Sequence, residues 1–210
     1  MANIHTGALK KSVTATVGTL LMIGCIQTVA AQELSGIRNT TVISGDALSQ
    51  ISGVSNTNMA AGDGNLQSNV GTLAIGNIAS SANELQQRSR IEEWLVNQQN
   101  ITGIKGAAFQ QSEGWLSINQ AAGQGNAQSN SFGVAMGISA SNLSDTTLQG
   151  VQADRQGLTG TGERSGHSTS RVEIDKTAFE GARGVIQVNQ SAGTGNATSN
   201  SFRMNMALKP

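Results

Sequence analysis

The sequence predicts an all-β protein, a β-arch or β-solenoid stack of three imperfect repeats joined by flexible linkers. One twelve-residue pattern occurs three times, beginning at Asn58, Asn119 and Asn189. Around this pattern apolar and polar residues alternate with period two, which is typical of strands. The only proline is Pro210, so no proline interrupts a ladder of stacked strands.

Each repeat predicts a strand, a tight turn and a second strand. In the second repeat Leu116, Ile118 and Gln120 alternate with polar residues, which predicts a strand with one face inward. After the turn, Asn126 begins a strand whose inward face is lined by amides at first and is apolar further along. Glycine permits the positive φ values of the reversal. The expected turn glycines are Gly62, Gly64, Gly123, Gly125, Gly193 and Gly195.

The amides predict a hydrogen-bonded ladder. A lone buried Asn or Gln is costly because its donors and acceptors lose water, whereas identical amides stacked ~4.8 Å apart bond to one another. The expected assembly ladder consists of Asn58, Asn65, Gln67, Asn119, Gln120, Asn126, Gln128, Asn130, Asn189, Gln190, Asn196 and Asn200. Expected core residues are the phenylalanines Phe109, Phe132, Phe179 and Phe202. Ser129 and Ser199 have the opposite parity, and we expect them to face solvent.

The expected organisation alternates repeat units with linkers. The first unit is degenerate, since Met59 stands where the others have Gln, and we expect it to cap the stack. A shorter strand precedes each unit, at 41–44, 101–104 and 171–175. For residues 84–99 the sequence allows two alternatives, a helix or a loop that contains a short strand. Leu158–His167 is predicted to be a flexible segment. The predicted boundaries are a signal peptide at 1–31, unit 1 at 32–76, a linker at 77–99, unit 2 at 100–137, a flexible linker at 138–169 and unit 3 at 170–210.

The start of the chain predicts export. Residues 1–31 combine a basic beginning, an apolar stretch and small residues before Gln32, the parts of a secretory signal. The apolar stretch is about 14 residues, shorter than the ~20 that span a bilayer, so we expect no transmembrane helix in the mature chain. The alternative is a degenerate lipobox with an acylated Cys25. Cys25 is the only cysteine, so we expect neither disulfides nor thiol chemistry after cleavage.

Composition and motifs argue against several functions. Acidic and basic residues number 13 each, so the basic surplus of a nucleic-acid binder is absent. The Gly-x-Gly turns lack the Lys-Ser/Thr of a phosphate-binding loop. His167 is the only histidine after the predicted signal and has no partner cluster in the sequence. We therefore expect no enzyme, no metal site and no cofactor.

The spacing Asn-x-Ala-Ala-x-x-x-Asn-x-Gln resembles the repeat of the Fap functional-amyloid proteins of Gram-negative bacteria. The second unit matches this spacing at Asn119, Ala121, Ala122, Asn126 and Gln128. The first unit matches it as fully, whereas the third has Ser and Thr at two of the positions. The resemblance implies three such units behind a Sec signal. A Cys-x-Cys pair near the C-terminus, associated with the main fibre subunits, is missing, which favours a minor subunit, a nucleator or a related adhesin.

Two functional hypotheses follow. The first is a secreted structural protein at the cell surface of a Gram-negative bacterium, which forms or decorates cross-β fibres in surface adhesion and the biofilm matrix. Its partners would be itself or other fibre subunits, and an outer-membrane secretion channel. The alternative is a monomeric β-solenoid that acts as a surface or periplasmic binding module for haem, a glycan or a fibre subunit. The hypotheses differ in whether the open strand edges pair with further chains.

Overall fold

The computed structural model describes residues 36–91, 95, 97–142, 150–154 and 167–208. These residues lie in the unit Ser35–Pro210. They form thirteen strands and contain no helix, which confirms the all-β prediction, and the described part of 84–99 takes the strand alternative. The predicted signal at 1–31 with Cys25, and Leu158–His167 except its last residue, lie outside the described residues.

Each repeat contributes three successive strands to the stack. In the first repeat these are β1 (Ile37–Ile43), β2 (Ser52–Ala61) and β3 (Leu66–Ile75); in the second, β6 (Gln98–Ile104), β7 (Glu113–Gln124) and β8 (Ala127–Gly137); in the third, β11 (Thr169–Ile174), β12 (Arg183–Thr194) and β13 (Ala197–Ala207). Between repeats lie β4 (Ile78–Ser81), β5 (Gln86–Arg90), β9 (Ser139–Asn142) and β10 (Gly150–Asp154).

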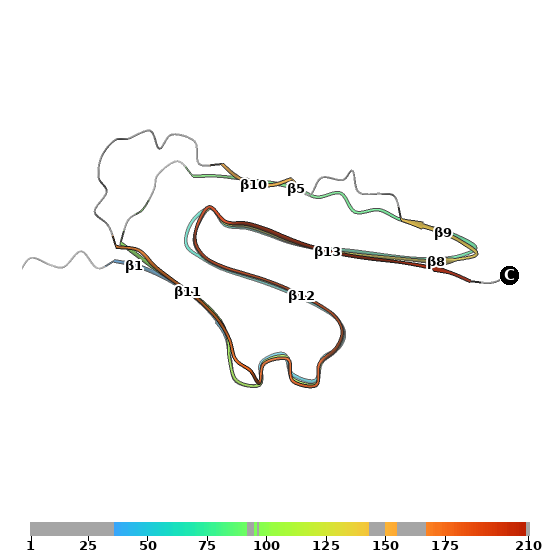
Figure 1. The fold of residues 1–210 in the computed structure, drawn as a ribbon, viewed down its shortest axis with the longest axis horizontal. Helices are drawn as coiled ribbons and strands as arrows, with labels where there is room; N and C mark the ends of the chain where they lie inside the picture. Colours follow the sequence, from blue (N-terminus) through green and yellow to red (C-terminus); the bar gives the residue numbers. More distant parts are fainter. Residues whose placement is uncertain (1–35, 92–94, 96, 143–149, 155–166, 209–210) are drawn as a thin grey trace, which may run out of the picture. The chain divides into compact units, whose positions relative to one another are not determined.

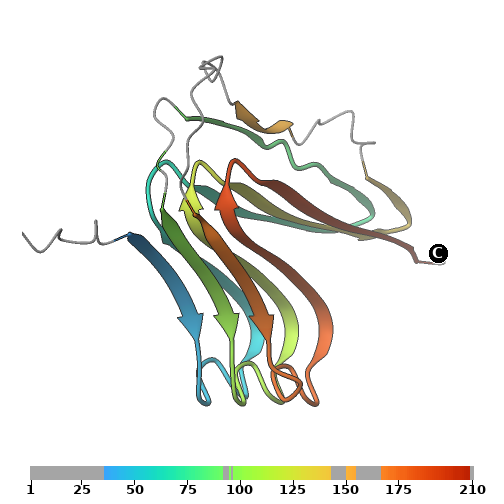
Figure 2. The same ribbon diagram turned by 60° about the vertical axis from the view of Figure 1, so that its left-hand side comes forward.

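The repeats stack as parallel, in-register rungs. The three main sheets have the orders β1-β6-β11, β12-β7-β2 and β13-β8-β3, so the second repeat is central in each. Asn58 pairs with Asn119, and Asn119 with Asn189, the spacing at which the sequence pattern recurs. Figure 1 looks along the stack, where the rungs superpose, and Figure 2 shows the strands side by side. This arrangement confirms the predicted stack of β-arches.

The strands between the repeats also pair. β4 pairs with β9, and β5 pairs with β10, each in parallel. They belong to the segments predicted as linkers. Asn83, which follows β4, donates from Nδ2 to Ser131 Oγ at 3.1 Å and to the Phe132 carbonyl oxygen at 2.7 Å. These segments therefore cover part of the outer face of β8.

The strand β7 is buried on both faces, which differs from the expected single inward face. On one side Leu116 and Ile118 join a buried apolar cluster with Ile104 and Phe109. On the other side Asn119 meets Asn130 of β8 through a hydrogen bond of 3.0 Å. The reason is that β7 is the middle layer between the β6 and β8 sheets, so its polar residues have partners in a neighbouring strand rather than water.

The expectation for Ser129 is wrong, whereas Ser199 is exposed as expected. Ser129 is fully buried and its hydroxyl donates to Ser199 Oγ at 3.1 Å. Ser129 belongs to the central rung and lies between the outer rungs, so parity alone does not decide its exposure. Ser199 lies on the third repeat, whose strand β13 is an outer strand of its sheet among the described residues.

The apolar core lies between the first and second layers. Phe109 is fully buried and stacks on Phe179, with ring centroids 5.1 Å apart. The corresponding residue of the first repeat, Leu48, is 36% exposed. All three have positive φ, at 59°, 63° and 59° for Phe109, Phe179 and Leu48, so the repeats share one loop conformation between their first two strands. The layer between β7 and β8, in contrast, is lined by amides.

Candidate functional site

Two columns of asparagine run along the stack between the second and third layers. Asn119 Nδ2 donates to Asn58 Oδ1 at 2.9 Å, and Asn189 Nδ2 donates to Asn119 Oδ1 at 3.0 Å. In the facing strands the bonds from Asn130 to Asn69 and from Asn200 to Asn130 measure 3.0 and 3.1 Å. Both columns thus donate from the later repeat to the earlier one.

The two columns are also bonded to each other within every rung. In the first repeat Asn69 Nδ2 donates to Asn58 Oδ1 at 2.9 Å. The equivalent bonds, from Asn130 to Asn119 and from Asn200 to Asn189, are both 3.0 Å. Because each amide has partners in its own rung and in the next, the burial of the central pair leaves its polar groups bonded.

A third asparagine column follows the turn. Asn126 Nδ2 donates to Asn65 Oδ1, and Asn196 Nδ2 to Asn126 Oδ1, both at 2.8 Å. Asn126 Nδ2 also reaches the Gly193 carbonyl oxygen at 3.0 Å, and Asn65 Nδ2 the Gly123 carbonyl oxygen at 2.9 Å. The column thereby holds the turns of successive repeats together.

The turn glycines have the conformation that the sequence predicts. The first glycine of each turn has φ of 99°, 119° and 127° at Gly62, Gly123 and Gly193, and the second has φ of 66°, 62° and 70° at Gly64, Gly125 and Gly195. A Cβ on Gly62 would collide with the carbonyl oxygen of Gly123, and one on Gly123 with that of Gly193. Only glycine therefore permits this approach of the backbones.

The glutamine columns do not extend over all three repeats. Gln190 Nε2 donates to Gln120 Oε1 at 2.6 Å, but the first repeat has Met59 at this position. Gln67 Nε2 donates to Gln128 Oε1 at 2.8 Å, and the third repeat has Thr198 there. Each glutamine column therefore spans two rungs, whereas the asparagine columns span all three.

Aromatic rings form a further column in the same layer. Phe132 stacks on Phe202 at a centroid distance of 5.6 Å, and Trp115 stacks on Phe132 at 4.5 Å. The first repeat has Gly71 opposite Phe132, and a Cβ on Gly71 would collide with the Trp115 ring. Trp115 of the second repeat thus fills the position that a phenylalanine would take in the first.

Sequence reasoning missed several polar residues of this layer. Gln187 Oε1 accepts hydrogen bonds from Trp115 Nε1 and Ser117 Oγ, both at 3.2 Å, while its Nε2 donates to the Ser131 carbonyl oxygen at 3.0 Å. The first layer holds another amide pair, since Asn39 Nδ2 donates to Asn100 Oδ1 at 2.8 Å. This pair could have been predicted, because the sequence has asparagine at the same position of the first and second repeats.

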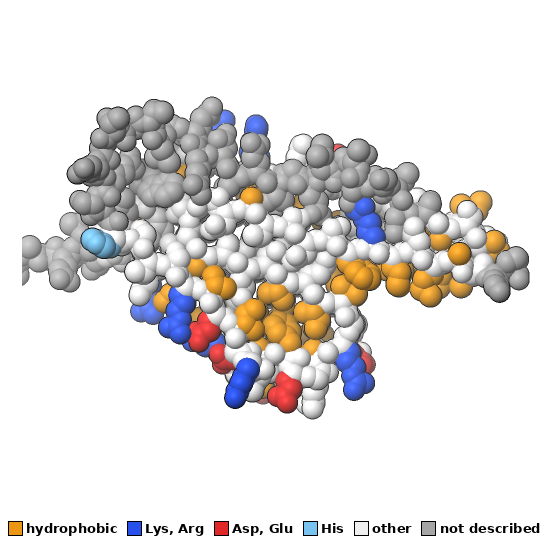
Figure 3. Space-filling view, viewed as in Figure 1, with side chains coloured by type: hydrophobic (Ala, Val, Ile, Leu, Met, Phe, Trp, Pro, Cys, Tyr) orange, Lys and Arg blue, Asp and Glu red, His pale blue; other side chains and the backbone are white. Residues whose placement is uncertain are grey.

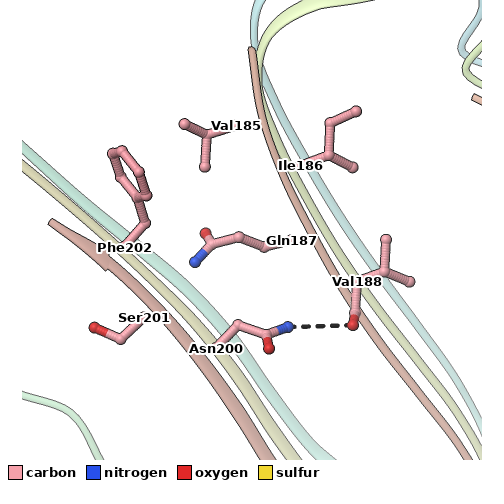
Figure 4. A pocket seen from close by; sticks show the side chains of 7 residues that line it. All are labelled: Val185, Ile186, Gln187, Val188, Asn200, Ser201 and Phe202. Carbon is pink, nitrogen blue, oxygen red and sulfur yellow. Dashed lines mark hydrogen bonds between the residues drawn. The ribbon is translucent and has the colours of Figure 1, made fainter. Parts of the chain in front are cut away.

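A hollow of about 430 Å³ opens at the third-repeat end between β12 and β13. In Figure 4 Val185 and Gln187 point from β12 toward Phe202 and Asn200 of β13, and Asn200 Nδ2 donates to the Val188 carbonyl oxygen at 3.1 Å. The full lining is Val185, Ile186, Gln187, Val188, Asn200, Ser201 and Phe202. The hollow is therefore the uncovered end of the space that holds the aromatic and amide columns.

Large apolar side chains remain exposed at the ends of the stack. Ile186 and Met206 are 36% and 40% exposed on the third repeat, and Leu73 and Ile75 are 66% and 68% exposed on the first. Figure 3 shows hydrophobic side chains gathered on the third-repeat face between β11 and β12 and along β13. The apolar part of the face predicted after the turn is thus partly solvent-exposed.

Potential metal ligands do not cluster in the described part of the chain. Within the described ranges no group of three or more His, Cys, Asp and Glu could hold a metal ion. His167 is exposed, and its backbone nitrogen donates to Asn97 Oδ1 at 3.1 Å. No helix in the part of the chain that the structure describes is long and apolar enough to cross a bilayer.

Comparison with known proteins gives one family match. A family model described as the functional amyloid protein FapB/FapC family matches residues 25–207. No solved structure matches the chain. The match covers all three repeats and both intervening segments.

Proposed function

Because the chain belongs to the functional amyloid protein FapB/FapC family, we propose that it is a structural subunit of cross-β fibres. Copies of the chain would stack end to end through their two outer rungs, which are the first and third repeats. The family is one of structural amyloid proteins rather than enzymes. We also propose that the protein is secreted through an outer-membrane channel and acts in the biofilm matrix and in adhesion at the cell surface.

The observation that carries the proposal is the pair of open rungs. Among the residues that the structure describes, the second-repeat strand of every main sheet is paired on both sides, whereas the strands of the first and third repeats are paired on one side only. The unpaired edge of such a strand is a template on which a further chain can pair. Their backbone donors and acceptors lie in the register that already joins the repeats within the molecule.

The outer rungs are also chemically alike. The first repeat has Asn58, Asn65 and Asn69 where the third has Asn189, Asn196 and Asn200. A third repeat followed by the first repeat of another copy would therefore continue the three asparagine columns. Stacked identical amides are a source of stability in cross-β fibres. These residues, predicted as an assembly ladder, are the ones to which we assign self-assembly.

Fibre formation tests the proposal. The chain from Gln32 onward should polymerise with a lag phase in thioflavin fluorescence and should diffract with cross-β spacings of about 4.7–4.8 Å and ~10 Å. A chain that stays monomeric at high concentration, with strand-rich circular dichroism, would contradict the proposal and favour the binding-module alternative. In that case haem and glycan titrations would follow.

A further inference from the structure

We propose that, in a fibre, Trp115 of each copy packs against Phe202 of the preceding copy and so closes the hollow at its third-repeat end. The inference rests on the proposed function, because it names the contact by which one copy recognises the next. A second copy of this chain thus covers the open side of the hollow with its first-repeat end.

The first step is the position of the Trp115 ring. The ring lies over Gly71, because a Cβ on Gly71 would meet its Cη2 and Cζ3 atoms. Its stacking contact with Phe132 covers one face. Gly71 belongs to β3, an outer strand of its sheet, and glycine brings no side chain to shield the ring. Trp115 is accordingly only partly buried, although its strand β7 is central.

The second step is the matching surface at the other end. Phe202 is the last ring of the column and stacks on Phe132. It also lines the hollow beside Val185, which stands where the second repeat has Trp115. Since valine is smaller than tryptophan, the third repeat leaves the hollow open. Phe202 is the one aromatic residue among those that line the hollow, and in Figure 4 Val185 points toward it.

The third step is register. Residues of the third repeat meet their counterparts of the second with no slip along β13 and β8, and the same holds for β8 and β3. If the next copy continues this register, its Gly71 follows Phe202, just as Gly71 lies opposite Phe132 within the molecule. The Trp115 ring over that Gly71 then lies beside Phe202. The aromatic column becomes continuous across the junction, in the repeating order Trp115, Phe132, Phe202.

The turn supports the same direction of stacking. A Cβ on Gly123 would collide with the carbonyl oxygen of Gly193 in the following repeat, but a Cβ on Gly193 would meet only Ser170 Oγ at 3.4 Å and Asn196 Nδ2 at 3.6 Å. In the single chain a Cβ on Gly193 is therefore opposed only by its backbone conformation, φ 127°, whereas a following rung would add a collision like that between Gly123 and Gly193.

Fluorescence of Trp115 in fibres tests the contact. A Trp94→Phe background leaves Trp115 as the single reporter. Within one chain Phe202 can also influence Trp115, because Phe132 stacks on both rings and Gln187, which lines the hollow with Phe202, accepts from Trp115 Nε1. The effect of Phe202→Ala on the soluble chain is therefore measured first and subtracted from its effect on the fibre.

We expect Phe202→Ala fibres to show a red-shifted Trp115 emission and an increased acrylamide quenching constant. Phe179→Ala is the matched control, since Phe179 lies in the same repeat but stacks on Phe109, and it should leave both quantities unchanged.

The outcomes separate this contact from fibre formation itself. Fibre diffraction of the parent chain tests the proposed function, and unchanged Trp115 emission in diffracting Phe202→Ala fibres overturns only the junction. If Phe202→Ala does not assemble, Phe202→Leu keeps apolar volume without a ring and provides the same comparison. The residual soluble concentration should rise about three- to tenfold in Phe202→Leu, the amount expected for loss of one aromatic pair. An unchanged concentration together with unchanged emission would also overturn the junction.

Discussion

The Trp115 ring occupies the place that Gly71 leaves empty in the neighbouring repeat. The two residues belong to different strands and different rungs, yet together they replace the phenylalanine that the second and third repeats have at this position. The first repeat thus retains an aromatic layer although it has no aromatic residue of its own in β3.

This relationship predicts that Gly71→Ala destabilises the chain and that a second substitution, at Trp115, relieves the collision. Gly71→Ala places a Cβ into the Trp115 ring, and we expect it to lower the free energy of unfolding of the soluble chain by about 1–3 kcal/mol, as overpacking does. The double variant Gly71→Ala with Trp115→Val has no ring for the new Cβ to meet. It should therefore have a higher free energy of unfolding than the single variant Trp115→Val. Urea denaturation measures both. Additive effects of the two substitutions would contradict the packing described.

Charge in the turn column should oppose assembly. Asn126→Asp with Asn196→Asp places two carboxylates one rung apart, and at ~5 Å and an effective dielectric constant of ~20 their repulsion is about 3 kcal/mol. We expect a longer lag phase or no fibres in a thioflavin assay. Ser139→Asp is the control, because Ser139 is exposed although it follows the central repeat. Ser129 does not serve, because it is fully buried, and Ser199 does not serve, because the next rung of a fibre would cover it. Equal inhibition by the control would remove the column from the mechanism.

Gly193→Ala should impair fibre growth more than the stability of the single chain. Within the molecule its Cβ meets no collision and is opposed only by the backbone conformation at φ 127°, whereas in a fibre it would also face the next rung. Gly181→Ala is the control, since Gly181 also has positive φ, at 70°, and its Cβ would touch Gln111 of the same chain at 3.5 Å. Seeded elongation rates and urea midpoints distinguish the two effects. Similar elongation by both variants would argue against stacking at the third-repeat turn.

Removing Asn83 should loosen the cover of β8. Asn83 is 6% exposed and its Nδ2 bonds Ser131 and the Phe132 carbonyl oxygen. Asn83→Ala leaves these buried acceptors without this donor, which costs about 1–3 kcal/mol. We expect faster amide hydrogen exchange in β8. Asn205→Ala, at an exposed position of β13, should have no such effect, and equal exchange in the two variants would contradict the role of Asn83.

The predicted export signal has a direct test. Mass spectrometry of the exported protein should find Gln32 as its first residue. Detection of an acyl chain on Cys25 would instead establish the lipoprotein alternative and place the chain on a membrane.

The repeats made the stack predictable. Asparagines recurring at Asn58, Asn119 and Asn189 indicated which residues pair, because a parallel in-register sheet places identical residues side by side. The turn glycines were predictable for a related reason, since positive φ restricts the choice of residue. Periodicity and turn chemistry are local properties, and both are readable without knowing what packs against the strand.

The layers were less predictable. Ser117 and Asn119 alternate with apolar residues and therefore resemble a solvent-facing side, yet both are fully buried because Gln187 and Asn130 bond them. Polar residues that satisfy one another in the interior give the same period-two pattern as residues that face water. The position of the Trp115 ring over Gly71 was equally unpredictable from the sequence, because it depends on a side chain that crosses from one rung to the next.

The uniform direction of the asparagine bonds makes the stack electrically directional. In the columns of Asn119 and Asn130, the amide nitrogens of the second and third repeats donate to the preceding repeat, and the oxygens of the first and second repeats accept from the following one. Aligned peptide units add up to a macrodipole in a helix, and aligned side-chain amides should add in the same way along these columns. A polymer built by this stacking would carry partial charges of opposite sign at its two tips, so that an arriving subunit is oriented by the field before contact and the tips elongate at unequal rates.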